Sequence, residues 1–83
     1  MSNKILKFSA AWCQPCKAMS ATLSRMTIPM DIDGIDVDDQ YEIASKYAIR
    51  GVPTLVMVDG AGVEVSRLVG SKTEAEIKNW VAA

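Results

Sequence analysis

Two thiols, Cys13 and Cys16, are the side chains of this 83-residue sequence best suited to chemistry. They are its only cysteines, they enclose Gln14 and Pro15, and the sequence contains no histidine. The lack of histidine excludes a Ser–His or Cys–His nucleophile pair and a histidine-ligated metal, and two thiolates are too few for a closed zinc site. The pair is suited to disulfide exchange, in which one thiolate attacks a disulfide and the second thiol resolves the mixed disulfide.

The expected position of the pair assigns a role to each thiol. Residues 4–10 predict a strand, and Pro15 predicts the first turn of the helix that follows, where its missing N–H is harmless. Cys13 then lies at the helix N-terminus, where unpaired backbone N–H groups and the helix dipole favour a thiolate. We therefore expect Cys13 to attack, and Cys16, which is less exposed and less acidic, to resolve. A metal site shared between subunits and a passive staple are the structural alternatives.

The apolar pattern predicts the order βαβαββα for the elements that position the thiols. Because a helix joins the first two strands, these should be parallel, whereas the turn at Asp59-Gly60-Ala61-Gly62 predicts an antiparallel hairpin. The strands are expected at residues 4–10, 30–38, 54–58 and 63–69, and the helices from Pro15, at 40–48 and from Thr73.

Two local signals refine these elements. The apolar positions of the second strand change parity at Gly34, which predicts a bulge or a bend there. Thr73 and Glu76 have the spacing of a capping box, in which each side chain accepts a backbone N–H of the other residue.

Length and charge limit the remaining classes of protein. A chain of this length is expected to form one domain, residues 1–83, and a net charge of −1 indicates neither a nucleic-acid partner nor an anionic membrane surface. Lys7 interrupts the apolar run near the start before it could form an export signal. We therefore expect a cytoplasmic monomer, and in that compartment paired cysteines are more often catalytic than structural.

Three motifs stand out along the chain: residues 12–17, Trp-Cys-Gln-Pro-Cys-Lys, residues 47–55, Tyr-Ala-Ile-Arg-Gly-Val-Pro-Thr-Leu, and Val69-Gly70. Together they resemble the thioredoxin family: the first is similar to its active site, the second to its second landmark and the last to a third. The resemblance covers nearly the whole chain and indicates a short thioredoxin, close in size to a glutaredoxin, without the family's N-terminal strand and helix. It implies the minimal thioredoxin fold, an α/β structure with a four-stranded mixed sheet flanked by three helices.

The resemblance also implies a substrate site beside Cys13. Pro53 matches the family's cis-proline, and the backbone of Val52 would pair with an extended substrate segment. Ordinary partial burial is the alternative for the tryptophan of the motif, and the glutamine stands where glycine is common. The substrate-binding residues expected from the resemblance are Trp12, Gln14, Pro15, Val52, Pro53 and Gly70.

Two positions depart from the family pattern. Lys7 and Gly34 stand where most thioredoxins have a buried acid and a buried lysine. We hypothesise that Lys7 pairs with Asp36 or Asp33 across the space that Gly34 leaves, and that its charge favours the thiolates. The alternative is that Lys7 extends to water without a role. Lys17 is a second candidate modulator, for which a solvated surface position is the alternative.

The aspartates around the second strand do not fit a calcium loop. With Gly34 at the sixth position of an EF-hand loop, the first and twelfth positions fall on Pro29 and Gln40, which are not ligands of that loop. We expect these charges to protect an exposed sheet edge from pairing. The aspartates are Asp31, Asp33, Asp36, Asp38 and Asp39.

The resemblance implies a general dithiol–disulfide oxidoreductase that reduces protein disulfides, has no cofactor of its own, and is recharged by an NADPH- and FAD-dependent thioredoxin reductase. One alternative is a glutaredoxin-like donor, recharged by glutathione or serving ribonucleotide reductase. Another is a thioredoxin-fold subunit that binds a partner without catalysis, in which the cysteines are incidental.

Overall fold

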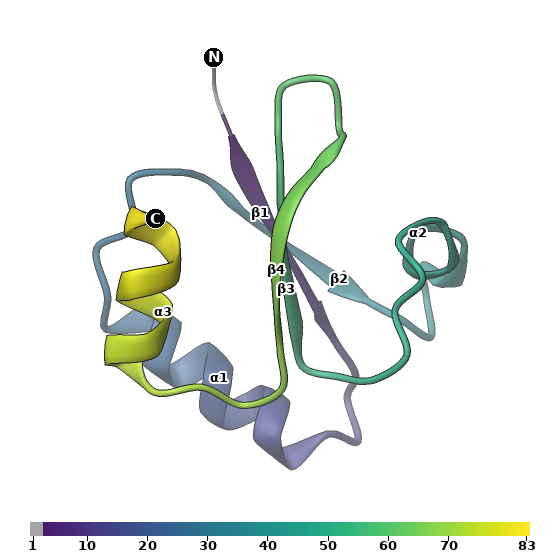
Figure 1. Cartoon of the computed structure of the whole chain (residues 1–83). Helices are drawn as coiled ribbons and strands as arrows, with labels where there is room; N and C mark the ends of the chain where they lie inside the picture. Colours follow the sequence, from purple (N-terminus) through teal and green to yellow (C-terminus); the bar gives the residue numbers. More distant parts are fainter. Residues whose placement is uncertain (1–2) are drawn as a thin grey trace.

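The computed structural model describes residues 3–83, and its elements follow the predicted order βαβαββα (Figure 1). The first two residues of the predicted domain lie outside the described residues. Among the described residues, no helix has the length and apolar character to cross a membrane. The elements are β1 (Lys4–Ser9), α1 (Gln14–Ser24), β2 (Ile32–Asp36), α2 (Tyr41–Lys46), β3 (Thr54–Val58), β4 (Glu64–Val69) and α3 (Glu74–Ala82).

The four strands form one mixed sheet in the order β2-β1-β3-β4. β1 pairs with β2 in parallel, while β1 with β3 and β3 with β4 are antiparallel, so both pairing predictions are confirmed. Helices α1 and α3 cover one face of the sheet and α2 covers the other (Figure 1). Because β1 is central and leads directly into α1, the sheet fixes the place where that helix begins.

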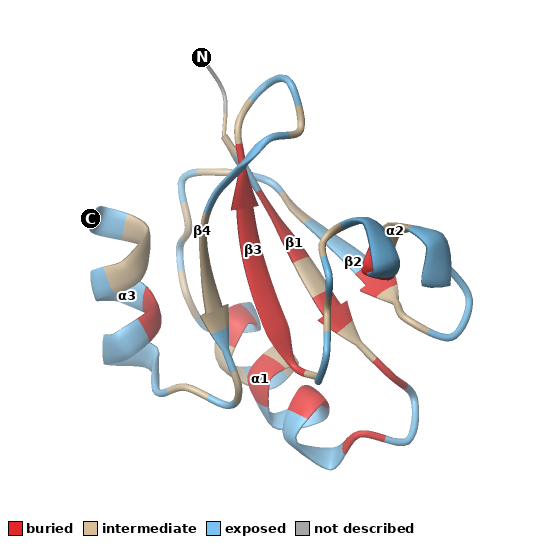
Figure 2. Cartoon of the chain, turned by 45° about the vertical axis from the view of Figure 1, so that its right-hand side comes forward, coloured by how far each residue is buried: buried red, intermediate tan, exposed pale blue. Residues whose placement is uncertain are grey.

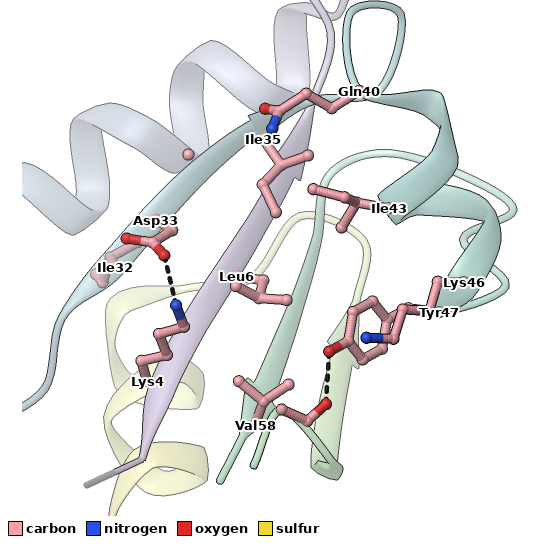
Figure 3. A pocket seen from close by; sticks show the side chains of 12 residues that line it. Lys4, Leu6, Ile32, Asp33, Ile35, Gln40, Ile43, Lys46, Tyr47 and Val58 are labelled. Atoms are coloured by element: carbon pink, nitrogen blue, oxygen red, sulfur yellow. Dashed lines mark hydrogen bonds and ion pairs between the residues drawn. The ribbon is translucent and has the colours of Figure 1, made fainter. Parts of the chain in front are cut away.

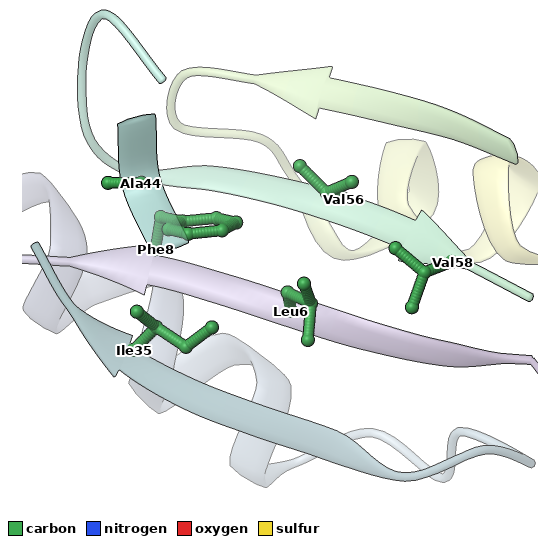
Figure 4. Close-up of a cluster of buried hydrophobic side chains, with 6 residues drawn as sticks. All are labelled: Leu6, Phe8, Ile35, Ala44, Val56 and Val58. Carbon is green, nitrogen blue, oxygen red and sulfur yellow. The ribbon is translucent and has the colours of Figure 1, made fainter. Parts of the chain in front are cut away.

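Successive side chains of the central strands point to opposite faces of the sheet, and this alternation divides the buried residues into one cluster on each face. Ile5 and Leu55 pack with Met19 of α1 and Ile77 of α3. The intervening side chains on the same strands pack beneath α2. All five residues of β3 are buried, as expected for a strand covered on both faces (Figure 2). The cluster beneath α2 consists of Leu6, Phe8, Ile35, Ala44, Val56 and Val58 (Figure 4).

The bulge expected at Gly34 is absent, and that prediction is wrong. The β1–β2 register continues through this position, where Lys7 lies opposite Gly34. The apolar parity changes because β2 contributes to both clusters: Ile32 packs on the α1 side and Ile35 on the α2 side. The register shift of the sheet lies instead between β3 and β4, at Met57 and Val58.

β2 is shorter than the predicted strand at residues 30–38 because a side chain closes the turn behind it. Asp36 Oδ1 accepts the backbone N–H of Asp38 at 2.9 Å and that of Asp39 at 3.4 Å. The expected edge position of β2 is confirmed by the strand order. That its aspartates prevent edge pairing stays a prediction.

The capping box of α3 is confirmed. Thr73 Oγ1 accepts the backbone N–H of Glu76 at 3.2 Å, and Glu76 Oε1 accepts the backbone N–H of Thr73 at 3.0 Å. The hydrogen bond from the Thr73 backbone holds the pKa of Glu76 below its usual value. α3 therefore begins at a position that its own sequence determines.

The face covered by α2 is less complete than the other face, because α2 has six residues where α1 and α3 have 11 and nine. A hollow of about 530 Å³ remains beside α2, with Leu6, Ile43 and Val58 among its lining residues (Figure 3). Its rim carries an ion pair between Lys4 and Asp33, whose Nζ and Oδ2 atoms are 2.9 Å apart.

Candidate active site

Cys13 is the N-cap residue of α1. Its backbone is extended, with φ −95° and ψ 106°, and its sulfur accepts the backbone N–H of Cys16 at 3.1 Å. Serine, threonine or aspartate oxygens usually cap a helix in this way. In the reduced protein the same N–H and the positive end of the helix dipole would stabilise a negative charge on the Cys13 sulfur.

Cys13 and Cys16 are joined by a disulfide, with their Cα atoms 5.2 Å apart. The two-residue spacer and the first helical turn bring the sulfurs together, as predicted. The expected contrast in exposure is not found in this oxidised state, because the two residues are 4% and 3% exposed. Cys13 and Cys16 pack together with Ala10 in one buried cluster, so exposure does not distinguish their roles.

The two cysteines differ in what surrounds them. The Cys13 sulfur lies 3.8 Å from the carbonyl oxygen of Val52. Cys16 borders a hollow of about 340 Å³ that Lys17, Ser20 and Asp36 also line. Cys13 therefore faces the segment that precedes β3, and Cys16 faces the junction of α1 with β2.

The predicted cis-proline is confirmed: the Val52–Pro53 peptide bond is cis. Val52 packs against the cysteine cluster, and Pro53 is buried. The carbonyl oxygen of Pro53 accepts the backbone N–H of Gly70 at 2.9 Å. Gly70 has φ +89°, a conformation that favours glycine. The fold thus brings Val52, Pro53 and Gly70 to the same end of the sheet as Cys13.

Trp12 is 69% exposed, so the alternative of ordinary partial burial is wrong. Its Nε1–H donates to Asp38 Oδ2 at 3.0 Å, which ties the loop before α1 to the turn after β2. Gln14 and Pro15 are also exposed on the first turn of α1. Sequence reasoning treated Asp38 only as an edge charge and missed this contact, because no local spacing connects it to Trp12. That these side chains bind substrate stays a prediction.

The predicted pairing of Lys7 with an aspartate of β2 is wrong. Lys7 is half-buried, and its Nζ donates to Ser20 Oγ of α1 at 2.9 Å. Asp33 lies opposite Leu6, so alternation directs it to the α2 face, away from Lys7. Asp36 lies on the α1 face but accepts the backbone N–H groups of the turn behind β2.

Ser20 is a residue that the sequence interpretation missed, although it follows Cys16 by four residues and therefore lies on the same side of α1. A Cβ built on Gly34 would lie 3.9 Å from Lys7 Cε, an ordinary contact. The glycine is therefore not needed to admit the Lys7 stem. Lys17 is exposed. The roles of Lys7, Lys17 and Asp36 as modulators stay predictions.

Residues 3–83 contain no group of three or more His, Cys, Asp or Glu side chains arranged to hold a metal ion. The chemistry that the described geometry supports directly is reversible opening and closing of the Cys13–Cys16 disulfide.

Comparison with known proteins gives consistent matches. Thioredoxin of Bacillus subtilis is 39% identical over 79 residues, which span 89% of this chain and 74% of that protein. Thioredoxin H2 of Arabidopsis thaliana is 35% identical over 78 residues, covering 88% of this chain and 58% of that protein. The chain thus spans little more than half the length of the plant relatives it matches.

Solved structures agree with these sequence matches. A mutant thioredoxin from Halobacterium salinarum has a TM-score of 0.86 and 32% identity, covering 96% of this chain and 72% of that one. Fasciola hepatica thioredoxin has a TM-score of 0.87 and 28% identity, covering 98% and 79%. The family model described as Thioredoxin matches residues 2–83, and the chain belongs to the thioredoxin family.

Proposed function

We propose that the chain is a dithiol–disulfide oxidoreductase that reduces protein disulfides. The observation that carries the proposal is the disulfide between Cys13 and Cys16 at the N-terminus of α1, beside the cis Val52–Pro53 bond, in a chain of the thioredoxin family. A structural staple is a poorer explanation, because a disulfide that closes so short a loop removes little entropy from the unfolded chain.

The reaction proceeds in two exchanges. The Cys13 thiolate attacks one sulfur of the substrate disulfide, forms a mixed disulfide and releases the other substrate sulfur as a thiolate. The Cys16 thiolate then attacks the Cys13 sulfur, which re-forms the Cys13–Cys16 bond and releases the second substrate thiolate. Two electrons pass from the protein to the substrate, and the two released thiolates take up protons from the solution.

Val52 would hold the substrate. It precedes β3, so its backbone lies outside the strand pairing of the sheet, and its carbonyl oxygen is 3.8 Å from the Cys13 sulfur. An extended segment that paired with this backbone would place its own cysteine next to Cys13. The exposed Trp12 ring would provide an apolar surface beside that segment.

The electron source is proposed to be an NADPH- and FAD-dependent thioredoxin reductase. A relative named bifunctional thioredoxin reductase/thioredoxin, from Mycobacterium leprae, supports it: this chain is 33% identical to it over 82 residues, which are 18% of its length. Glutathione as the electron source and ribonucleotide reductase as the target remain alternatives. We also propose that the protein acts as a cytoplasmic monomer.

Reduction of insulin disulfides tests the function and the electron source together. One reaction contains NADPH and thioredoxin reductase, and a parallel reaction contains NADPH, glutathione and glutathione reductase. We expect turnover in the first and little in the second; the reverse result would establish the glutaredoxin-like alternative. No turnover in either reaction by a folded protein would contradict the proposed function. A Cys13→Ser, Cys16→Ser double variant with full biological activity would instead support a binding subunit.

A further inference from the structure

The segment of residues 47–53, here called the substrate loop, carries Val52 and Pro53 to the disulfide. It connects α2 to β3 and forms neither helix nor strand. Ala48, near its start, has φ 52°, in the left-handed region that disfavours a residue with a Cβ. Because the substrate loop has no helical or strand hydrogen-bonding pattern of its own, contacts from other elements must hold it in place.

Its downstream end is anchored beside the active site. Thr54 Oγ1 donates to the carbonyl oxygen of Gly51 at 2.8 Å, and the Pro53 carbonyl oxygen accepts the Gly70 N–H at 2.9 Å. These hydrogen bonds connect the substrate loop to β3 and to the end of β4.

Its upstream end is anchored through Tyr47. The Tyr47 hydroxyl donates to the carbonyl oxygen of Gly62 in the β3–β4 turn at 2.6 Å, the contact drawn as a dashed line from Tyr47 in Figure 3. The Tyr47 ring packs against Phe8, with ring centroids 6.1 Å apart. The Tyr47 carbonyl oxygen accepts Nη2–H of Arg67 at 2.6 Å. Twenty residues of sequence separate the two partners of this last bond.

The Arg67 guanidinium is itself held by Glu64 of the same strand. Nε donates to Oε2 at 2.7 Å and Nη2 donates to Oε1 at 2.6 Å, with the two side chains 30% and 32% exposed. This hydrogen bond raises the pKa of Arg67 and lowers the pKa of Glu64. Nη2 carries two hydrogens, so it can bond the Glu64 carboxylate and the Tyr47 carbonyl together. The ammonium of a lysine has no planar fork for this geometry.

We propose that Arg67, oriented by Glu64, is a positioning residue for protein substrates, because its bond to the Tyr47 carbonyl fixes where the substrate loop begins. The inference deepens the proposed function and rests on it. Arg67 does not touch the sulfurs: its effect reaches Val52 through the loop backbone. It therefore matters for a protein disulfide that must pair with Val52, and not for a small disulfide that needs only the Cys13 thiolate.

The test compares Arg67→Met with Arg25→Met, each assayed with insulin and with the small aromatic disulfide 5,5′-dithiobis(2-nitrobenzoate). Arg25 is a matched control because it is exposed at the end of α1 and its side chain bonds only Thr22 Oγ1, at 3.4 Å, within the described contacts. We expect Arg67→Met to raise KM for insulin about tenfold, the ratio that corresponds to about 1.4 kcal/mol. The kcat for insulin and the rate with the small disulfide should change less than about twofold, and Arg25→Met should leave all three quantities unchanged.

A purely structural role would give a different pattern. An unchanged KM for insulin in Arg67→Met, or equal losses with insulin and the small disulfide, would overturn the proposal. Glu64→Gln keeps the arginine but weakens its orientation, so we expect a smaller rise in KM in the same direction, and this variant decides the question if Arg67→Met does not fold. Amide exchange at residues 48–52 should accelerate in Arg67→Met and not in Arg25→Met. Failure of the unaltered protein in both assays would instead contradict the proposed function.

Discussion

Two segments meet at the disulfide, and they are held in place by different kinds of contact. The geometry of the cysteine pair rests on a short-range contact: Cys13 caps α1 through a hydrogen bond to a residue three positions away. The substrate loop has short-range bonds to α2, such as that from the Ile49 N–H to the Ala44 carbonyl oxygen at 2.9 Å. It is also held by β4 and the β3–β4 turn, through bonds that join residues 15 and 20 positions apart. The reactive group is thus locally encoded, while the surface that we propose presents a substrate to it also depends on the assembled sheet.

Single replacements of the two cysteines should have the largest effect on activity and test the local segment. Cys13→Ser should abolish insulin reduction, because it removes the thiolate that faces the substrate loop. The Cys16→Ser variant should still attack a substrate disulfide through Cys13, but it should not resolve the mixed disulfide. This adduct with the substrate should therefore accumulate, and mass spectrometry would detect it. If Cys16→Ser formed no adduct while Cys13→Ser did, the assigned roles would be reversed.

Phe8→Ala should have the largest effect on stability and tests the support of the substrate loop. The ring is fully buried beneath α2 and contacts the Tyr47 ring, so we expect a loss of about 3–5 kcal/mol in the free energy of unfolding, measured with urea. Phe8→Leu retains most of the buried area and serves as the control. A loss below about 1 kcal/mol in Phe8→Ala would show that this cluster contributes little to stability.

Lys7→Met tests whether the local segment is as independent as its contacts indicate. Lys7 is bonded to Ser20, one turn beyond Cys16, and we hypothesise that its ammonium favours a nearby thiolate by charge. We expect Lys7→Met to move the pH profile of disulfide reduction to higher pH, and Ser20→Ala, which only frees the ammonium, to move it less. Coincident profiles for Lys7→Met and the parent would remove Lys7 from the mechanism.

Glu76→Gln should have the smallest effect, because the capping box lies outside both segments. The folded-state pKa of Glu76 is depressed by the Thr73 N–H, so its charge contributes stability above the unfolded pKa, near 4.5, that is lost as pH falls through the folded value. The difference in urea midpoint between parent and Glu76→Gln should therefore be present at pH 7 and disappear in acid, with insulin reduction unchanged. A difference that grew in acid would contradict the sign of this shift.

Two of the failed predictions concern contacts across the sheet. Lys7 was expected to bond an aspartate of the neighbouring strand. Strand alternation directs Asp33 to the other face, however, and the Asp36 carboxylate accepts a backbone N–H of the turn behind β2. The parity change at Gly34 suggested a bulge, whereas helices on both faces of the sheet let one regular strand contribute to two clusters. Each error came from applying a local rule to a position that packing on both sides had decided.

The sequence by itself determined the order and types of the elements, the capping box of α3 and the cysteine pair at the start of α1. These depend on interactions between residues a few positions apart, which are visible as periodicity and spacing. The tertiary structure alone decided that Trp12 bonds Asp38, that Lys7 bonds Ser20 and that Arg67 holds Tyr47. Those contacts exist only after the strands have paired and the helices have packed on the sheet, because the assembled fold, and not distance along the chain, brings their partners together.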